Sequence, residues 1–211
     1  KAPAFSTAKL RGVDPSLGPF MQSTGEVIGL HRDPRVALAK ALCGAALVPA
    51  RIEGAATALL SIADRDKAAL PRLARALDRA GFSLAATEGT RAALLAAGFK
   101  AEPVAKLGAG NGTGDVVDFI LAGRARLVVN TPTPRSGAVR DAAEIRLAAI
   151  AEGVLCLTAI ETAVAAAEAM EPEIQARLTD VRSLDEWLHT GATPGSEAAA
   201  SVGVVATAMG R

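Results

Sequence analysis

Short, largely apolar runs alternate with amphipathic segments from residue 58 to residue 170. The runs, each of which predicts a strand, are 58–62, 82–86, 101–104, 127–129 and 154–157. Because these runs do not alternate apolar with polar residues, we expect strands that are covered on both faces. Such strands, separated by helices, predict an α/β fold with a doubly wound, five-stranded parallel sheet, and we expect the flavodoxin-like strand order.

The segments between these runs carry apolar residues at helical spacing. The predicted helices cover about 70–80, 91–97, 116–121, 141–152 and 158–170. Gly81 stands where a helix C-terminus favours glycine, and Pro71 suits a first helical turn. The residues that we expect on the inward face of the third helix are Val116, Val117, Ile120 and Leu121.

The N-terminal part of the chain has a different pattern. Residues 1–30 are rich in Gly, Pro, Ser and Thr, and they offer turns at 13–15 and 17–19 rather than a helical period. A helix start comes next at Asp33-Pro34, where an N-cap residue precedes proline, and Gly44 is expected to end this helix. This segment is not expected to fold alone.

A domain boundary is expected between residues 45 and 57, because Pro49 and Gly54 interrupt a stretch without periodicity. The predicted organisation is an N-terminal segment with linker, a main domain and a low-complexity, mostly unstructured tail, at 1–50, 56–190 and 191–211. Within 181–188, Ser183 suits a helix N-cap and Trp187 is expected to pack in the core.

Polar residues stand where the predicted strands end. These residues are Ser61, Thr87, Lys106, Asn130 and Thr158. In open parallel sheets the loops gather at the carboxyl ends of the strands, and ligands bind there. We therefore expect these five side chains to line one rim, with helix capping alone as the alternative.

The sequence 85–90, Ala-Ala-Thr-Glu-Gly-Thr, suggests what that rim binds. A buried strand here leads into a helix, so that Thr87, Gly89 and Thr90 fall where free N–H groups and the helix dipole attract phosphate. Gly89 allows a ligand to approach the backbone closely. The motif predicts an anion pocket, although Thr87 and Thr90 would equally serve as helix caps.

Composition narrows the possible partners. The chain has 211 residues, of which 50% are hydrophobic, enough for a substantial core. The net charge is +1, aromatic residues make up 3% and Tyr is absent, so neither a basic nor an aromatic surface for nucleic acid is evident. Nucleic acid is therefore not an expected partner. A membrane is not expected either, because no apolar run reaches the length of a membrane span.

The cysteines and histidines do not suggest a reactive or metal site. Cys43 and Cys156 lie far apart and outside any CxxC motif, which favours reduced, buried thiols in a cytoplasmic protein. His31 and His189 have no neighbouring ligand set, so neither metal binding nor acid–base chemistry is expected. The chain begins at Lys1, from which we expect a piece of a longer protein.

The N-terminal motif carries a family resemblance. Residues 12–19, Gly-Val-Asp-Pro-Ser-Leu-Gly-Pro, and 21–29, Met-Gln-Ser-Thr-Gly-Glu-Val-Ile-Gly, resemble the end of the second ATP-grasp half of the carbamoyl phosphate synthetase large subunit. The rest of the chain, up to about Leu188, resembles the allosteric domain of that subunit, which shares its fold with methylglyoxal synthase. The resemblance implies a regulatory domain that binds nucleotide effectors of the UMP and IMP class. It also implies an incomplete ATP-grasp segment before that domain.

The same resemblance implies roles for individual residues. The effector-binding positions would be Ser61, Lys67, Thr87, Thr90, Lys106, Asn130 and Thr131. Thr158 resembles a position between the effector pocket and the synthetase interface and is expected to relay the signal while capping its helix. The fragment itself would have no catalytic or metal site, because ATP and Mg or Mn belong to the rest of the parent enzyme. Its partners would be the remainder of the large subunit and the glutaminase small subunit.

Several positions depart from the family pattern. Phe20 replaces a usual Glu, and the loops at 108–114 and 134–140 differ from their usual form, which leaves the effector open. Ala2 and Leu157 stand where ornithine-responsive members carry acidic residues, so we expect a weak ornithine response or none.

Two other functions fit the sequence less well than an effector-binding domain. A free-standing methylglyoxal synthase would use an Asp such as Asp115 for proton abstraction, but no His lies near the fourth strand. A phospho-receiver domain would use an acidic pair such as Asp64 and Asp66, but Thr158 stands where its Lys is required.

Overall fold

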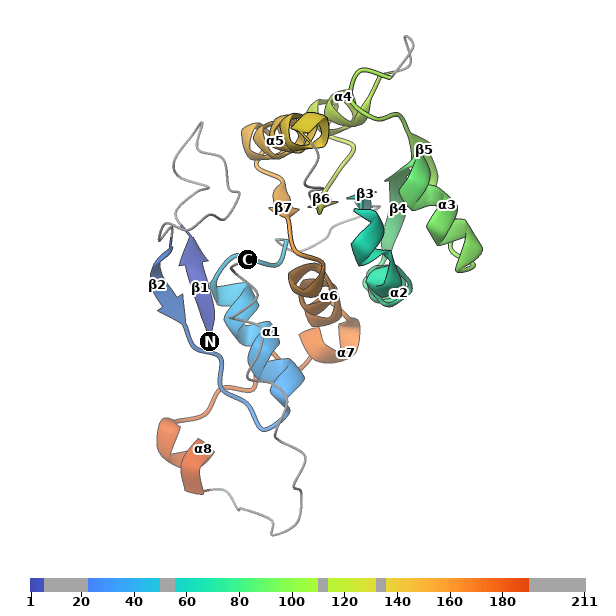
Figure 1. Ribbon diagram of the computed structural model, residues 1–211. Helices are drawn as coiled ribbons and strands as arrows, with labels where there is room; N and C mark the ends of the chain where they lie inside the picture. The colour runs from blue at the N-terminus through green and yellow to red at the C-terminus, as the bar shows by residue number, and fades with distance from the viewer. Residues whose placement is uncertain (6–22, 50–55, 110–113, 132–135, 190–211) are drawn as a thin grey trace.

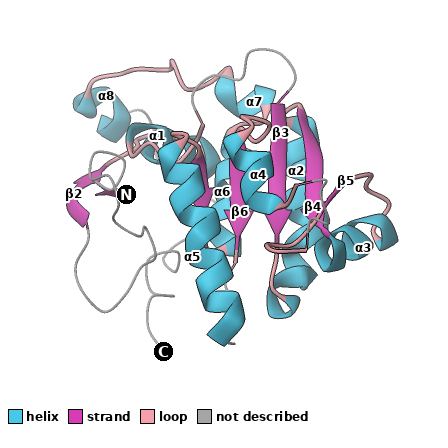
Figure 2. Ribbon diagram, turned by 90° about the horizontal axis from the view of Figure 1, so that it is seen from above, coloured by secondary structure: helices cyan, strands magenta, loops and turns pink. Residues whose placement is uncertain are grey.

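A parallel five-stranded sheet forms the centre of this computed structural model, which describes residues 1–5, 23–49, 56–109, 114–131 and 136–189 (Figures 1 and 2). Its strands are β3 (Ala56–Ser61), β4 (Phe82–Thr87), β5 (Glu102–Val104), β6 (Leu127–Asn130) and β7 (Leu155–Leu157). All four neighbouring pairs are parallel, in the order β5-β4-β3-β6-β7. The predicted α/β fold with a five-stranded parallel sheet is confirmed.

The order of the strands differs from the flavodoxin-like one that we expected. The first strand of this sheet, β3, lies in the middle, with β4 and β5 on one side and β6 and β7 on the other. A flavodoxin-like order would place the first strand next to an edge. The apolar runs identify the strands, but their order depends on which face each crossover helix covers, and a local pattern does not carry that information.

Helices cover both faces of the sheet. One buried cluster joins the sheet to α2 (Leu70–Arg79), α3 (Glu88–Ala96) and α6 (Ile160–Ala169). A second cluster joins the other face to α4 (Val116–Leu121) and α5 (Ser136–Ala151). Because the first two crossovers use one face and the next two use the other, the chain moves outward from β3 in both directions. The alternation of helix faces thus produces the observed strand order.

The predicted helices exist, but several bounds and faces differ. Helix α3 begins three residues earlier than expected and α5 begins at Ser136 rather than 141. Pro71 lies in the first turn of α2, and Gly81 takes a left-handed φ of 86° after it, both as predicted. Leu121, expected to face the sheet, is half exposed, whereas Val116, Phe119 and Ile120 are buried and Val117 is partly buried against the core. A 3₁₀ turn, η2 (Asp64–Ala69), precedes α2.

The N-terminal segment contains two strands that the sequence analysis missed. Strands β1 (Ala2–Phe5) and β2 (Ser23–Val27) pair antiparallel. Residues 6–22 separate them, and these residues, which include the turns predicted at 13–15 and 17–19, lie outside the described part. Because the two strands are far apart in sequence, no hairpin signal of the usual length marks them.

Helix α1 (Pro34–Gly44) starts and ends where predicted. The Asp33 carboxylate accepts a hydrogen bond from the N–H of Arg35, as an N-cap does. A third buried cluster packs α1 on α6, so that the two helices lie side by side in Figure 1. Gly29, between β2 and α1, lies so close to α1 that a Cβ there would be 2.0 Å from the carbonyl oxygen of Ala37.

Two short helices complete the described chain, α7 (Pro172–Gln175) and α8 (Leu184–His189). Ser183 caps α8 as predicted, since its hydroxyl accepts from the N–H of Glu186, whose carboxylate accepts from the N–H of Ser183. Trp187 does not pack in the core as predicted. It lies at the surface against His31, with their ring centroids 5.4 Å apart.

Three further expectations can be compared with the structure. Cys43 is exposed and Cys156 half-buried, so the prediction of two buried thiols was wrong, because Cys43 lies on the outer side of α1. The predicted tail at 191–211 lies outside the described residues. Within the described ranges, none of the helices combines the length and apolar character needed to span a bilayer.

Candidate functional site

The strand order places a topological switch point at the carboxyl ends of β3 and β6. The connection that leaves β3 covers one face of the sheet and the connection that leaves β6 covers the other. Ligands of open α/β sheets bind where neighbouring connections diverge in this way. Ser61 and Asn130 end these two strands and are direct neighbours in the register. The N–H of Thr131 donates to the Ser61 carbonyl at 3.1 Å, so these three predicted residues are brought together.

Two buried threonine hydroxyls hold the loop after β3. The Thr90 hydroxyl oxygen accepts from the N–H of Ile62 at 2.9 Å, and the Thr131 hydroxyl oxygen accepts from the N–H of Ala63 at 2.8 Å. Both threonines are buried. Buried N–H groups require such partners, so these hydroxyls fix the course of the backbone at the carboxyl ends of β3 and β6. Thr90 therefore has a structural role, but not the helix-capping one that was the alternative, because its hydroxyl serves the loop after β3 and does not cap α3.

Thr87 is the N-cap residue of α3, but its side chain makes no capping hydrogen bond. Its hydroxyl lies 3.4 Å from that of Thr90 instead. The first turn of α3, Glu88 to Thr90, therefore presents its N–H groups without the usual side-chain acceptor. This turn carries the positive end of the helix dipole.

Lys67 adds a second positive group beside this turn. A Cβ built on Gly89 would lie 3.4 Å from the Lys67 Nζ, which places the ammonium close to the backbone of α3. Lys67 also forms an ion pair with Asp64 at 2.7 Å, but the Asp64 carboxylate is 95% exposed. An ion pair so exposed contributes little, and Lys67 can exchange it for a ligand. An ammonium next to a helix N-terminus favours an anion between the two.

Lys106 and Thr158 lie farther from this centre. Thr87 pairs in register with Val104, so Lys106 lies two residues beyond the neighbouring strand end, where it is exposed. Thr158 is half-buried between β7 and α6. The N-cap of α6 is Ala159, so the predicted capping role of Thr158 was wrong. The helix begins two residues later than the sequence pattern indicated, which moves Thr158 out of reach of the cap position.

Asp115 has a structural position. Its carboxylate accepts from the N–H groups of Gly108 and Val117, both at 2.9 Å, and forms a capping box with Asp118. Partial burial by itself would raise the pKa of Asp115, but the backbone N–H groups of Gly108, Val117 and Asp118 hold it below its ordinary value. A carboxylate stabilised in this way is a weak base, which disfavours proton abstraction by Asp115.

The sequence analysis did not identify Asp64, the ion-pair partner of Lys67, as a member of this site. Asp64 was considered only as part of an acidic pair, yet Asp64 and Lys67 are three residues apart, which is the spacing of neighbours on one side of a helical turn. That spacing was the signal available in the sequence. Among the described residues, no three His, Cys, Asp or Glu side chains gather as metal ligands do.

Comparisons with known proteins identify a domain family and relatives of the chain. Residues 69–158 match the family model of the MGS-like domain. The chain is 47% identical over 171 residues to a carbamoyl phosphate synthase large chain from Thermomicrobium roseum, covering 81% of this chain and 15% of that protein. It is 44% identical over 172 residues to a carbamoyl phosphate synthase large chain, C-terminal section, from Methanopyrus kandleri, covering 81% of this chain and 31% of that one. The chain thus spans a third or less of the length of these relatives.

Proposed function

We propose that this chain is the regulatory domain of a carbamoyl phosphate synthase and that it binds a nucleotide monophosphate. The chain carries an MGS-like domain and is related to the C-terminal part of carbamoyl phosphate synthase large chains. The relationship to a C-terminal section disfavours the free-standing lyase. The observation that carries the proposal is the Lys67 ammonium beside the uncapped first turn of α3.

The phosphate of the effector binds between Lys67 and the N–H groups of residues 88–90. A phosphate monoester supplies the negative charge that the ammonium and the helix dipole both favour. Asp64 loses its ion pair with Lys67 in the process and, being exposed, remains solvated. Lys106, exposed beyond β5, supplies a second cation from the side of the rim.

The sugar and base extend toward β3 and β6. Ser61 and Asn130 lie side by side there and offer a hydroxyl and an amide, which can hydrogen-bond a ribose or a base edge. Thr90 and Thr131 keep the loop after β3 in place, so their contribution to binding is largely that of a rigid frame.

The remaining parts of the enzyme supply the chemistry. ATP, its Mg or Mn ion and carbamoyl phosphate synthesis belong to the rest of the parent chain, and the glutaminase small subunit is a further partner. Thr158, between β7 and α6, remains the predicted relay from effector to synthetase. Its role in this proposal is to contact the neighbouring domain, since it does not cap α6.

Calorimetric titration of the chain with UMP, IMP, ornithine and the nucleosides uridine and inosine tests the proposal. Lys67→Ala is expected to weaken nucleotide binding by about 1–3 kcal/mol, because one charge-assisted contact to phosphate is lost. Binding of the nucleosides is expected to change far less, and ornithine is expected to bind weakly or not at all.

Lys100→Ala is the matched control, since Lys100 is exposed beyond the C-terminal end of α3 rather than at its first turn. It should leave nucleotide affinity unchanged. Equal losses in Lys67→Ala for nucleotide and nucleoside would show that this lysine does not hold phosphate. Absence of nucleotide binding to the unmodified chain would reject the proposed function itself.

A further inference from the structure

Ion pairs and short stretches of helix connect the proposed effector site to the N-terminal segment. We call this connection the ion-pair path. It starts at Lys67 in η2, which runs directly into α2. From α2 it crosses to α6, follows the chain to α7 and ends on α1. In Figure 1 α6 lies between α2 and α1, in contact with both.

The first crossing lies between α2 and α6. Arg72 follows Lys67 by five positions and belongs to the first turn of α2. Its Nε and Nη2 donate to the two carboxylate oxygens of Glu168, at 2.6 and 3.0 Å. A guanidinium that makes two such bonds to one carboxylate has a defined orientation. A movement of η2 and the start of α2 therefore reaches the last turn of α6.

The second crossing lies between α7 and α1. Glu173, five positions after Glu168, accepts from Nη1 of Arg35 at 3.2 Å. Nη2 of Arg35 donates at 3.3 Å to Oδ2 of Asp33, the N-cap residue of α1. Arg177 donates to the same oxygen at 2.7 Å. The start of α1 is thus held by side chains from the segment that follows α6.

Apolar packing beneath these pairs makes α6 a wall shared by two clusters. Ala163, Ala166 and Ala167 belong to the buried cluster that α6 forms with the sheet and α2, whereas Ala169 belongs to the cluster with α1. Small side chains allow the helices to approach closely. Because a close-packed interior transmits strain, a displacement of α6 by α2 is passed on to α1.

Ligand binding supplies the displacement. In the structure the Lys67 ammonium pairs with Asp64 at 2.7 Å, within η2 itself. In the proposed complex this ammonium pairs with phosphate beside the first turn of α3. The two arrangements restrain η2 differently, and η2 lies between β3 and α2. A ligand that favours one of two such arrangements shifts the equilibrium between them.

We propose that the Arg72–Glu168 pair couples the effector site to the N-terminal segment by way of α6 and α7. This inference rests on the proposed function, because it requires phosphate at Lys67. Unlike the predicted relay through Thr158, which leads to the neighbouring domain of the parent enzyme, the ion-pair path leads to α1 within the chain. Arg72 is exposed and Glu168 half-buried, so loss of their pair should change the coupling while the fold is kept.

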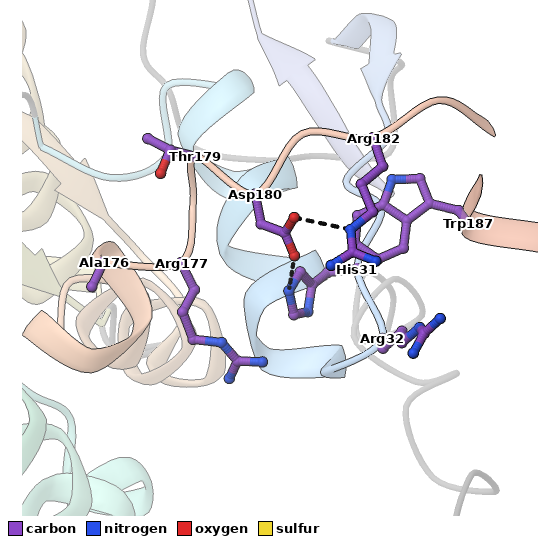
Figure 3. Close-up of a pocket in the computed structure, with 8 residues that line it drawn as sticks. All are labelled: His31, Arg32, Ala176, Arg177, Thr179, Asp180, Arg182 and Trp187. Atoms are coloured by element: carbon purple, nitrogen blue, oxygen red, sulfur yellow. Dashed lines mark hydrogen bonds and ion pairs between the residues drawn. The ribbon is translucent and has the colours of Figure 1, made fainter. Parts of the chain in front are cut away.

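Trp187 reports on the far end of the ion-pair path. It lines a cavity of about 390 Å³ beside α8, the α8 pocket, together with residues 31–32 and side chains from 176–182 (Figure 3). Its ring centroid is 5.4 Å from that of His31, two positions before Asp33. In Figure 2 α8 lies at the top left, whereas α3, which carries the proposed effector site, lies at the lower right. Since the chain has one Trp, tryptophan fluorescence comes from this residue alone.

The test is a titration of the chain with UMP and, separately, with IMP, followed in parallel by calorimetry and by Trp187 fluorescence. We expect the nucleotide that binds to change the fluorescence saturably, with the same midpoint as its heat of binding. Uridine and inosine, which have no phosphate, should leave the fluorescence unchanged. Lys67→Ala should weaken nucleotide binding equally in both measurements, which assigns the signal to the rim.

Variants of the Arg72–Glu168 pair test the path itself. Arg72→Gln and Glu168→Gln are each expected to change nucleotide affinity by less than about threefold and to reduce the fluorescence change at saturation by about half or more. The double variant should lose no more than either single one, because both remove the same pair. Arg72→Glu combined with Glu168→Arg should recover part of the signal.

Arg124→Gln is the matched control, because Arg124 is also an exposed arginine paired with one glutamate, Glu102, but lies off the path. It should leave affinity and fluorescence unchanged. Heat of nucleotide binding without a fluorescence change would overturn the coupling and leave the proposed function intact. A full fluorescence change in both folded single variants would also overturn it. Absence of heat with both nucleotides would reject the proposed function and the coupling together.

Discussion

The rim of the parallel sheet and the α8 pocket use polar groups in opposite ways. At the rim, Thr90 and Thr131 are buried and their hydroxyls accept hydrogen bonds from backbone N–H groups, so these atoms hold the loop after β3 in place. In the α8 pocket, which is lined by residues 31–32, 176–182 and Trp187, Arg177 and Arg182 are partly exposed and form ion pairs with Asp33 and Asp180. Substitutions at the rim should therefore affect stability strongly, whereas the pocket should respond to pH and salt.

The largest effect is expected for Thr90→Val at the rim. Valine preserves the shape of the side chain but leaves the buried N–H of Ile62 without its acceptor at 2.9 Å. An unsatisfied buried donor costs about 1–3 kcal/mol, which should appear as a lower free energy of unfolding in urea. Thr90→Ser keeps the hydroxyl and should lose clearly less. If valine and serine were equally destabilising, the hydrogen bond would not be what matters at this position.

A smaller effect, dependent on pH, is expected beside the α8 pocket. Burial by itself would raise the pKa of Asp33, but Arg35, Arg177 and the N–H of Arg35 lower it to about 2. Because the folded value lies below the ordinary one, Asp33 stabilises the fold above about pH 4 and loses this contribution as pH falls toward 2. After solvent screening we expect about 1–2 kcal/mol.

Asp33→Asn isolates this contribution from the titration of other carboxylates. The difference in unfolding free energy between the unmodified chain and Asp33→Asn should be largest near pH 6 and should shrink as the pH approaches 2. A difference that stays constant over this range would mean that the contribution of Asp33 does not depend on its charge and comes only from its hydrogen bonds at the start of α1.

The smallest effect is expected for Thr158→Val. Because Ala159 rather than Thr158 is the N-cap of α6, no capping hydrogen bond is lost, and the free energy of unfolding should change by less than about 0.5 kcal/mol. Thermal unfolding of the two chains side by side measures this. A loss of about 1 kcal/mol, typical of a removed N-cap, would contradict the observed start of the helix.

The sequence by itself determined the elements and their class. Largely apolar runs marked the strands of the five-stranded sheet, because its central strands are covered on both faces, although the edge strand β5 leaves Glu102 and Pro103 exposed. Local chemistry also located Asp33 at the start of α1, Gly81 after α2 and Ser183 at the start of α8. These signals depend only on neighbouring residues, so they can be recognised from the sequence without knowledge of the fold.

Only the tertiary structure decided how these elements meet. The strand order, the pairing of β1 with β2 and the position of Ser61 beside Asn130 depend on contacts between distant segments. The sequence likewise assigned the hydroxyl of Thr90 to a cap or a ligand, whereas packing brought the N–H of Ile62 to it. The α8 pocket was missed altogether, because Arg32 and Arg182 are distant in sequence and share no motif. Side chains so far apart form one pocket only when folding places them on one surface.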